Sequence, residues 1–419
     1  MKNITTINRY KKLIENFSYL TLINIINKLL PLIIVPFIVR TVGVEKYGII
    51  TFALSVISYF ILITQYSFTL TATKYISLHR SDIDKFSKHF NLVISIRVIF
   101  FVLIATLFLT VLMFLDISAN EKEVFIFTFL LVFADVLMPL WFFRGMEDMK
   151  YIAVFNIIAK LFYAFSIYLF VGEKDDFVWI PLLNSISLIM VNVYALYFAI
   201  RKYKIKRVPP SLVEIKEELI LGKDIFFSNI SVSFYRTINI ILLGLLTNYT
   251  AVGIYSLAEG LFMAYNSIIK SYTTVVYPHL AKYLDQPIRF YSQARKLFSF
   301  YVIILSLSSL ILFVSSSTII DFLYGEGHNE SIEILKIFSI ALLVEPLGGF
   351  FTAYLSLKSK YRVIRSITFK TMILNLLLVV PMIHIFQAKG VVYLFLLLSL
   401  IQVYLNIQAN REIFSTKKE

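Results

Sequence analysis

The sequence contains no cysteine, and it has few charged residues for its length. The absence of cysteine excludes disulfides, thiolate nucleophiles and cysteine-ligated metals. Only 16% of the 419 residues are charged, whereas about a quarter of the residues in soluble domains are. The five histidines lack the spacing of a metal-binding helix, so neither a metal site nor a cofactor is predicted. With 58% hydrophobic residues, the chain is predicted to be a polytopic membrane protein.

Long polar loops are also lacking. A membrane span needs about 20 predominantly apolar residues, and stretches of that kind follow one another along almost the whole sequence. The twelve predicted spans are 16–39, 47–70, 91–115, 124–143, 151–171, 177–200, 223–246, 252–280, 294–323, 331–356, 364–386 and 389–410. The loops on one side of the membrane are all short, which disfavours a catalytic domain on that side.

Positive charge is distributed unevenly between the two sides of these spans. The segments on the side of both termini carry 28 Lys and Arg residues, and the segments on the opposite side carry 5. Cytoplasmic segments are the ones enriched in Lys and Arg, so both termini are predicted to be cytoplasmic. The formal net charge of +14 therefore reflects membrane topology, and no nucleic acid partner is predicted.

The longest connection, residues 201–222, is charged and contains two consecutive prolines. It separates six spans from six, and the sequences around Gly48 and Gly253 are alike. Six helices followed by six equivalent ones indicate a parallel repeat about an axis along the membrane normal. The predicted fold is all-α, with twelve transmembrane helices in two pseudo-symmetric six-helix bundles. The predicted domains are an N-terminal bundle (1–200), a cytoplasmic linker (201–222) and a C-terminal bundle (223–419).

Seven Lys and Arg residues lie within or at the edge of predicted spans, where a charge facing lipid costs on the order of 3 kcal/mol. They are Lys28, Arg97, Lys160, Arg236, Lys270, Lys336 and Lys370. Arg97 and Lys336 stand near span ends, so we expect them to snorkel to the interface. Lys28 shares a helix face with Asn24 and Asn27, and this face is predicted to look into protein or a watery cavity. A snorkelling Lys28, or one paired with a carboxylate, is the alternative.

Helical periodicity places further polar residues on single faces of later spans. These residues are Asn229 and Arg236 in span 223–246, and Tyr255, Glu259, Asn266 and Lys270 in span 252–280. Glu259 and Lys270 would lie about 16 Å apart along a helix, too far to pair directly. Such a long polar face favours a wet cavity, although hydrogen bonds between packed helices are the alternative for residues of this kind.

The predicted cavity has more positive than negative side chains. Its cations are Lys28, Lys160, Arg236 and Lys270, with Lys370 as a further candidate, and its carboxylates are Asp135 and Glu259. Several unpaired cations favour an anionic ligand, and Lys and Arg bind phosphate and pyrophosphate well. The tyrosine, hydroxyl and amide side chains of the same faces suit sugar rings. The residues alone therefore predict an amphipathic anion as the ligand.

Four segments of the sequence, in this order along the chain, resemble a known family. They are LPLIIVPFIVRTVGVEKYGIITFALS (30–55), TATKYISL (71–78), FFRGMEDMKYIAVFNIIAK (142–160) and YSLAEGL (255–261). The chain resembles the Wzx-type flippases of lipid-linked O-antigen and other surface-polysaccharide repeat units, within the multidrug/oligosaccharidyl-lipid/polysaccharide exporter superfamily. The resemblance covers essentially the whole length.

The resemblance implies an inner-membrane transporter, not an enzyme, with two six-helix bundles facing each other in a V. It implies a cationic cavity lined by the first, second, seventh and eighth spans. The implied substrate is an undecaprenyl-pyrophosphate-linked oligosaccharide, moved from the cytoplasmic to the periplasmic leaflet by alternating access. The implied partners are this lipid-linked glycan and membrane lipid, and other polysaccharide-assembly membrane proteins are candidates.

Two finer assignments accompany the resemblance. Related exporters use Na⁺ or H⁺ gradients, which makes Asp135 and Glu259 candidates for ion coupling, although a static pair with Lys or Arg would explain each equally well. Arg144, Glu147 and Lys150, at the cytoplasmic end of the fourth span, are candidates for a cytoplasmic gate. Charges that only set the topology of a short loop are the alternative for these three.

Other functions compete with flipping. A cation-coupled exporter of small drugs or metabolites would share the fold, but it predicts a cavity dominated by carboxylates and aromatic residues. A membrane polymerase or ligase would need a sizeable periplasmic loop with acid and base residues, and the sequence shows no such loop. A purely structural scaffold leaves the intramembrane cations unexplained.

Overall fold

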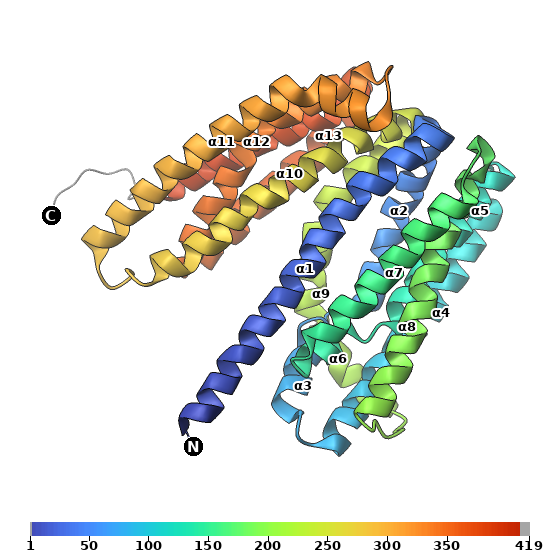
Figure 1. Cartoon of the computed structure of the whole chain (residues 1–419), viewed down its shortest axis with the longest axis vertical. Coiled ribbons are helices and arrows are strands. Elements are labelled where there is room, and N and C mark those ends of the chain that lie inside the picture. Colours follow the sequence, from blue (N-terminus) through green and yellow to red (C-terminus); the bar gives the residue numbers. More distant parts are fainter. Residues whose placement is uncertain (1, 411–419) are drawn as a thin grey trace. The chain divides into compact units, whose positions relative to one another are not determined.

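The structure is a computed structural model that describes residues 2–410, apart from the side chains of residues 2–14, 17, 20, 231–236 and 287. Helices account for the regular structure of this part of the chain, and no strand occurs in it (Figure 1). The elements are α1 (Lys2–Val42), α2 (Val44–Gln65), α3 (Thr71–His79), α4 (Ile83–Phe114), α5 (Ala119–Leu137), α6 (Leu140–Gly145), α7 (Met149–Phe170), η1 (Lys174–Val178), α8 (Trp179–Lys202), α9 (Leu212–Leu246), α10 (Tyr249–Ala281), α11 (Pro287–Tyr324), α12 (Asn329–Leu357) and α13 (Tyr361–Ala409).

The chain divides into two compact units, Met1–Arg236 (unit 1) and Thr237–Glu419 (unit 2). The division falls inside α9, so one helix begins in unit 1 and ends in unit 2. The predicted domain limits, 1–200, 201–222 and 223–419, stay a prediction.

Ten helices of the described residues are long and apolar enough to cross a membrane, and α9 adds a shorter apolar stretch, Thr237–Leu246. The ten count α13 once, although Gln387, with φ 49° and ψ −129°, divides it into two arms. This residue falls at the predicted boundary between spans 364–386 and 389–410. The prediction of an all-helical polytopic membrane protein is confirmed.

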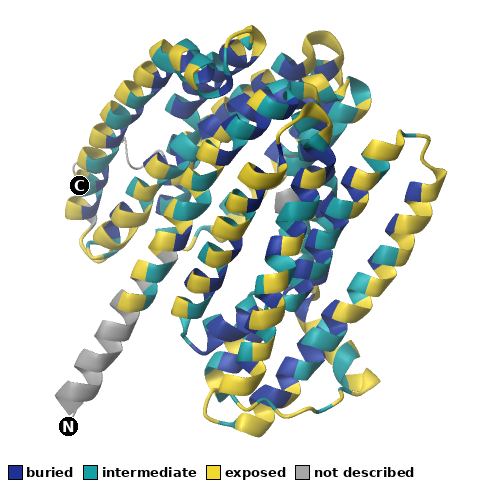
Figure 2. Ribbon diagram, turned by 45° about the vertical axis from the view of Figure 1, so that its right-hand side comes forward, coloured by how far each residue is buried: buried dark blue, intermediate teal, exposed yellow. Residues whose placement is uncertain are grey.

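In unit 1, five helices pack in a ring, each against the next, in the order α1, α2, α5, α8 and α7 (Figure 1). Helix α4 packs against α2 and α5. It exposes apolar side chains, among them Val102, Leu103 and Leu107, and Figure 2 shows exposed positions recurring along the helices of this unit. Because hydrocarbon solvates such a surface and water does not, we expect this face of α4 to contact lipid.

Two helices of unit 1 break within their predicted spans. Helix α2 ends at Gln65, and Tyr66 then takes a φ of 46°, which is strained for a residue with a bulky side chain. Helix α5 ends at Leu137, and α6 begins at Leu140 after Pro139. Breaks of this kind leave backbone carbonyls without helical partners, so another donor is needed near each.

Arg97 of α4 supplies those donors. Its side chain is 3% exposed and donates to the carbonyl oxygens of Thr64 at 3.3 Å, Asp135 at 2.8 Å and Met138 at 3.1 Å. It also forms an ion pair with the carboxylate of Asp135. The expectation that Arg97 snorkels to the interface is therefore wrong, because its charge is satisfied inside the protein.

The predicted linker packs against α4. Ser87 Oγ accepts a hydrogen bond from the backbone N–H of Lys206 at 3.0 Å, and Asn91 donates to the Lys206 carbonyl at 2.8 Å. Lys88 pairs with Glu214, and its hydrogen bond lowers the pKa of Glu214 to about 2. Residues 203–214 thus belong to the surface of unit 1 and are not a free tether.

In unit 2, α12 packs against three neighbours, α10, α11 and α13. Phe338, Phe351 and Tyr354 of this helix are almost completely buried. A helix that is apolar on all sides is typical of a central position. An acidic residue on a buried face of α12, such as Glu345, must consequently find its partners inside the unit.

Candidate functional site

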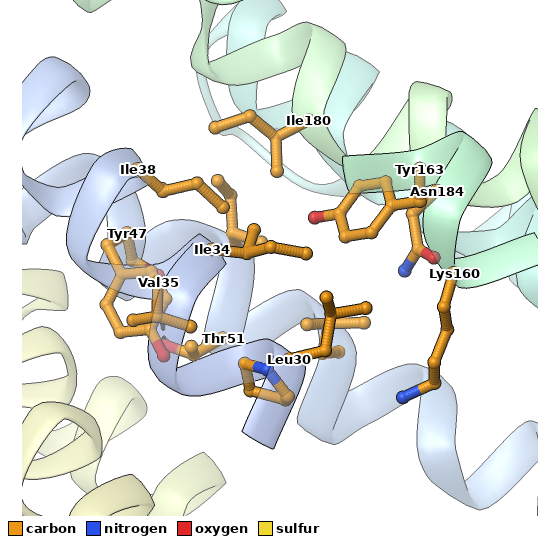
Figure 3. Close-up of a pocket in the computed structure, with 13 residues that line it drawn as sticks. Leu30, Ile34, Val35, Ile38, Tyr47, Thr51, Lys160, Tyr163, Ile180 and Asn184 are labelled. Carbon is orange, nitrogen blue, oxygen red and sulfur yellow. Dashed lines mark hydrogen bonds between the residues drawn. The ribbon is translucent and has the colours of Figure 1, made fainter. Parts of the chain in front are cut away.

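A cavity of about 240 Å³ lies among α1, α2, α7 and α8 of unit 1 (Figure 3). Aliphatic side chains, among them Ile34, Ile38 and Ile180, form most of its wall. Its polar residues are Tyr47, Thr51, Lys160, Tyr163 and Asn184. Figure 3 shows the Tyr163 hydroxyl directed into the cavity, with Asn184 and Lys160 on the same side. A largely apolar cavity with a few converging polar groups is the usual form of a small-molecule site.

Lys28 and Lys160 place two positive charges at this part of unit 1. Lys160 is half-buried and lines the cavity, whereas Lys28 is exposed on α1, two residues before the wall residue Leu30. The charge of Lys28 acts on Lys160. Among the described residues neither lysine has an ion-pair partner. Two like charges that act on each other favour an anion beside them.

The other predicted residues of unit 1 contribute unequally. Asn24 is exposed, and Asn27 is half-buried, with a buried Oδ1 that has no hydrogen-bond partner among the described residues. Asn229 is half-buried on α9. The side chain of Arg236 lies outside the described residues, so its predicted role stays a prediction.

The polar face predicted in span 252–280 divides into two groups in α10. Asn266 donates to Oε2 of Glu345 at 3.0 Å, and Lys270 Nζ lies 2.6 Å from Oε1 of the same carboxylate. The second group lies nearer the start of α10, where the Tyr255 hydroxyl donates to Glu259 at 3.2 Å. Lys270 is therefore paired, and its description as an unpaired cation is wrong because Glu345 of α12 reaches it.

The candidate ion-coupling residues have partners. Asp135 accepts from Gln65 at 2.9 Å and pairs with Arg97, and Glu259 accepts from Tyr255. Asp135 is thus paired with Arg97, and the coupling role of Asp135 and Glu259 stays a prediction. Within the described residues no cluster of three or more His, Cys, Asp or Glu could hold a metal ion.

The three candidate gate residues lie at the α6–α7 connection. Glu147 has a φ of 58° and forms an ion pair of 2.7 Å with Arg80 of the α3 C-terminus. The hydrogen bond from Arg80 to Glu147 raises the pKa of Arg80. Asn16 of α1 also donates to the Glu147 carbonyl at 3.0 Å. Arg144 is half-buried and Lys150 is exposed. Glu147 connects the α6–α7 turn to α1 and α3 through these contacts.

Sequence reasoning left several of these side chains out of the site. Glu345 lies within predicted span 331–356, but its partner Lys270 stands 75 residues away in the sequence. Tyr163 stands three residues after Lys160 and so shares its helix face. Thr51 lies on a polar face that helical periodicity predicts in span 47–70, whereas Tyr47 and Asn184 carry no distinctive sequence signal.

The same fold occurs in solved structures of membrane transporters. "Lipid II flippase MurJ, inward closed conformation" superposes with a TM-score of 0.71, 12% identity, and coverage of 94% of this chain and 87% of that chain. The "inward-facing conformation of a multidrug resistance MATE family transporter of the MOP superfamily" gives a TM-score of 0.69, 13% identity, and coverage of 96% and 100%. These likenesses show that the chain shares the fold of these two proteins.

The family is shown by the sequence itself. The model of the family described as "Polysaccharide biosynthesis protein" matches residues 13–284, more than half of the chain, and the chain belongs to this family. A protein of Escherichia coli (strain K12) named "Putative O-antigen transporter" is 27% identical over 379 residues, which are 90% of this chain and 91% of that protein. The predicted family is confirmed, and its relatives are named as transporters and not as enzymes.

Proposed function

We propose that the protein is a flippase for an undecaprenyl-pyrophosphate-linked oligosaccharide, such as an O-antigen or capsule repeat unit. The observation that carries the proposal is Lys160, which lines a cavity within membrane helices and feels the charge of Lys28; neither lysine has an acidic partner among the described residues. Unpaired intramembrane cations are retained where they bind something. The name of the Escherichia coli relative supports a glycan as part of the substrate.

The remaining parts of this proposal concern topology and movement. Counting both arms of α13 and the apolar end of α9 supports twelve spans in two six-helix bundles. We place the protein in the inner membrane with both termini cytoplasmic, because 28 of the loop cations lie on that side. Alternating access would move the glycan to the periplasmic leaflet, with Na⁺ or H⁺ as the coupling ion.

The test uses purified protein in liposomes that contain a fluorescent undecaprenyl-pyrophosphate oligosaccharide. We expect wild type to transfer this lipid between leaflets, and Lys28→Ala with Lys160→Ala to slow the transfer at least about 100-fold. The reason is that each charge-assisted hydrogen bond to phosphate contributes about 1.5–3 kcal/mol. Exposed Lys216 of the same unit provides the control, and Lys216→Ala should transfer like wild type.

Two results would contradict the proposal in different ways. Transfer that is unchanged in the double variant would remove Lys28 and Lys160 from the site but leave the activity. No transfer by wild type under either a Na⁺ or a proton gradient would favour the alternative, a cation-coupled exporter of small drugs or metabolites. Melting temperatures of all variants show whether each one is folded.

The cytoplasmic gate is tested separately at Glu147. An ion pair whose side chains are 38% and 43% exposed contributes no more than about 1 kcal/mol to stability. We expect Glu147→Gln to melt within a few degrees of wild type yet to slow transfer at least fivefold. Asp84→Asn, which removes the exposed pair with Lys206, is the matched control. Equal transfer by both variants would assign Glu147 to topology alone.

A further inference from the structure

Glu345 holds Lys270 in unit 2 as an anionic ligand would. The two atoms Nζ and Oε1 are 2.6 Å apart, and Asn266 occupies Oε2 at 3.0 Å, so both carboxylate oxygens are engaged. A phosphate oxygen is the same kind of acceptor for an ammonium group as a carboxylate oxygen. Two anions at one ammonium repel each other, so Glu345 and an anionic ligand compete for Lys270.

The two partners differ in their freedom to move. The Glu345 side chain is 16% exposed, on the central helix α12, and Asn266, which holds it, is 3% exposed. The Lys270 side chain is 39% exposed and has a flexible four-carbon stem. When the pair opens, Lys270 moves and Glu345 stays in place.

A second donor stands near Glu345. Tyr301 of α11 is completely buried, and its hydroxyl has no hydrogen-bond partner among the described residues. The charge of Glu345 acts on this hydroxyl. A buried carboxylate that loses its cation is costly unless another donor replaces it. We expect the Tyr301 hydroxyl to turn towards Glu345 once Lys270 has left.

We propose that Glu345 is a built-in competitor of the substrate pyrophosphate for Lys270. Glu345 neutralises Lys270 while the site is empty. The ion pair breaks when pyrophosphate binds to Lys270, and it forms again when the substrate is released. The inference rests on the proposed function, since it assumes a pyrophosphate substrate. Its consequence is that Glu345 weakens substrate binding and accelerates turnover.

The test combines binding and transfer by the full-length protein in lipid bilayers. We expect Glu345→Gln to bind inorganic pyrophosphate about tenfold more tightly, a usual size for coupling between two ligands, and to transfer the fluorescent lipid several-fold more slowly at saturation. Lys270→Met should abolish the gain, so Lys270→Met alone and with Glu345→Gln should bind equally. Glu333→Gln removes another ion pair of unit 2, between exposed Glu333 and half-buried Lys389, and should leave both quantities unchanged.

Three outcomes overturn the inference while wild type still transfers lipid. They are unaltered affinity in folded Glu345→Gln, a gain that persists without Lys270, and faster turnover. Glu345→Asp, which withdraws the carboxylate by one methylene, repeats the test with the charge retained and should give the same changes at smaller size. If wild type transfers no pyrophosphate-linked lipid, the proposed function fails instead, and with it the premise of the inference.

Discussion

Arg97→Met should destabilise the protein by about 3–5 kcal/mol, the usual cost of removing one partner of a buried ion pair. The substitution keeps the length of the side chain but leaves the Asp135 carboxylate with Gln65 as its remaining described side-chain donor. It also removes the donor from the carbonyls of Thr64 and Met138, where α2 and α5 end. Because whole domains are stable by only about 5–15 kcal/mol, little folded protein should be recovered. Thermal melting of purified protein in detergent measures the loss.

Two further variants test whether the lost ion pair causes the destabilisation of Arg97→Met. Arg97→Met together with Asp135→Asn removes the uncompensated charge and should recover part of the lost stability. Arg201→Met changes an exposed arginine of the same unit, beside the Tyr197 ring, and should alter stability by no more than about 0.5 kcal/mol. If Arg97→Met melts like Arg201→Met, the broken helices do not depend on Arg97.

Gly390→Ala should also be strongly destabilising, by about 2–3 kcal/mol, near the upper end for overpacking. A Cβ atom at this position would lie 2.0 Å from the carbonyl oxygen of Met382 and 2.5 Å from its carbonyl carbon. Both are backbone atoms, so no side-chain rotation can relieve the contact. The arms of α13 would have to separate near Gln387, where the chain already leaves helical geometry. Melting temperature again gives the measurement.

Gly349→Ala is the matched control, since the same methyl group is added to another glycine of unit 2. A Cβ atom at Gly349 meets nothing within 4 Å, and alanine is favoured over glycine inside a helix by roughly 0.8–1.0 kcal/mol. This substitution should therefore stabilise the protein slightly. Destabilisation of equal size by both variants would show that the close approach of Gly390 to Met382 is not the cause.

Much of the fold was predictable because the bilayer imposes one simple requirement, a helix of sufficient apolar length. Composition therefore predicted an all-helical polytopic membrane protein. The predicted boundary between the last two spans, at residues 386–389, coincides with the turn at Gln387. The breaks after Gln65 and Leu137 were not predicted. No glycine marks the first, where Tyr66 takes a positive φ, and Pro139 was not recognised as a break within its span.

The candidate site was predictable to the level of helix faces. Periodicity placed Asn266 and Lys270 together on one face, and both contact the same carboxylate. Periodicity could not predict that Glu345 is this carboxylate, because the partner of a side chain among acids far away in the sequence depends on which helices pack together. For the same reason, the pairing of Arg97 with Asp135 and the packing of residues 203–214 against α4 followed only from the structure.

The arrangement around Arg97 also constrains how the protein is made. Thr64 precedes Arg97 in the sequence, but Asp135 and Met138 follow it, and Asp135 stands 38 residues later. At roughly 5–20 residues per second, the ribosome needs about 2–8 s to reach Asp135 after adding Arg97. During that interval α4 carries a guanidinium group whose acidic partner does not yet exist. We therefore expect helices α2, α4 and α5 to enter the bilayer as a group, with the insertion machinery retaining α4 until α5 arrives.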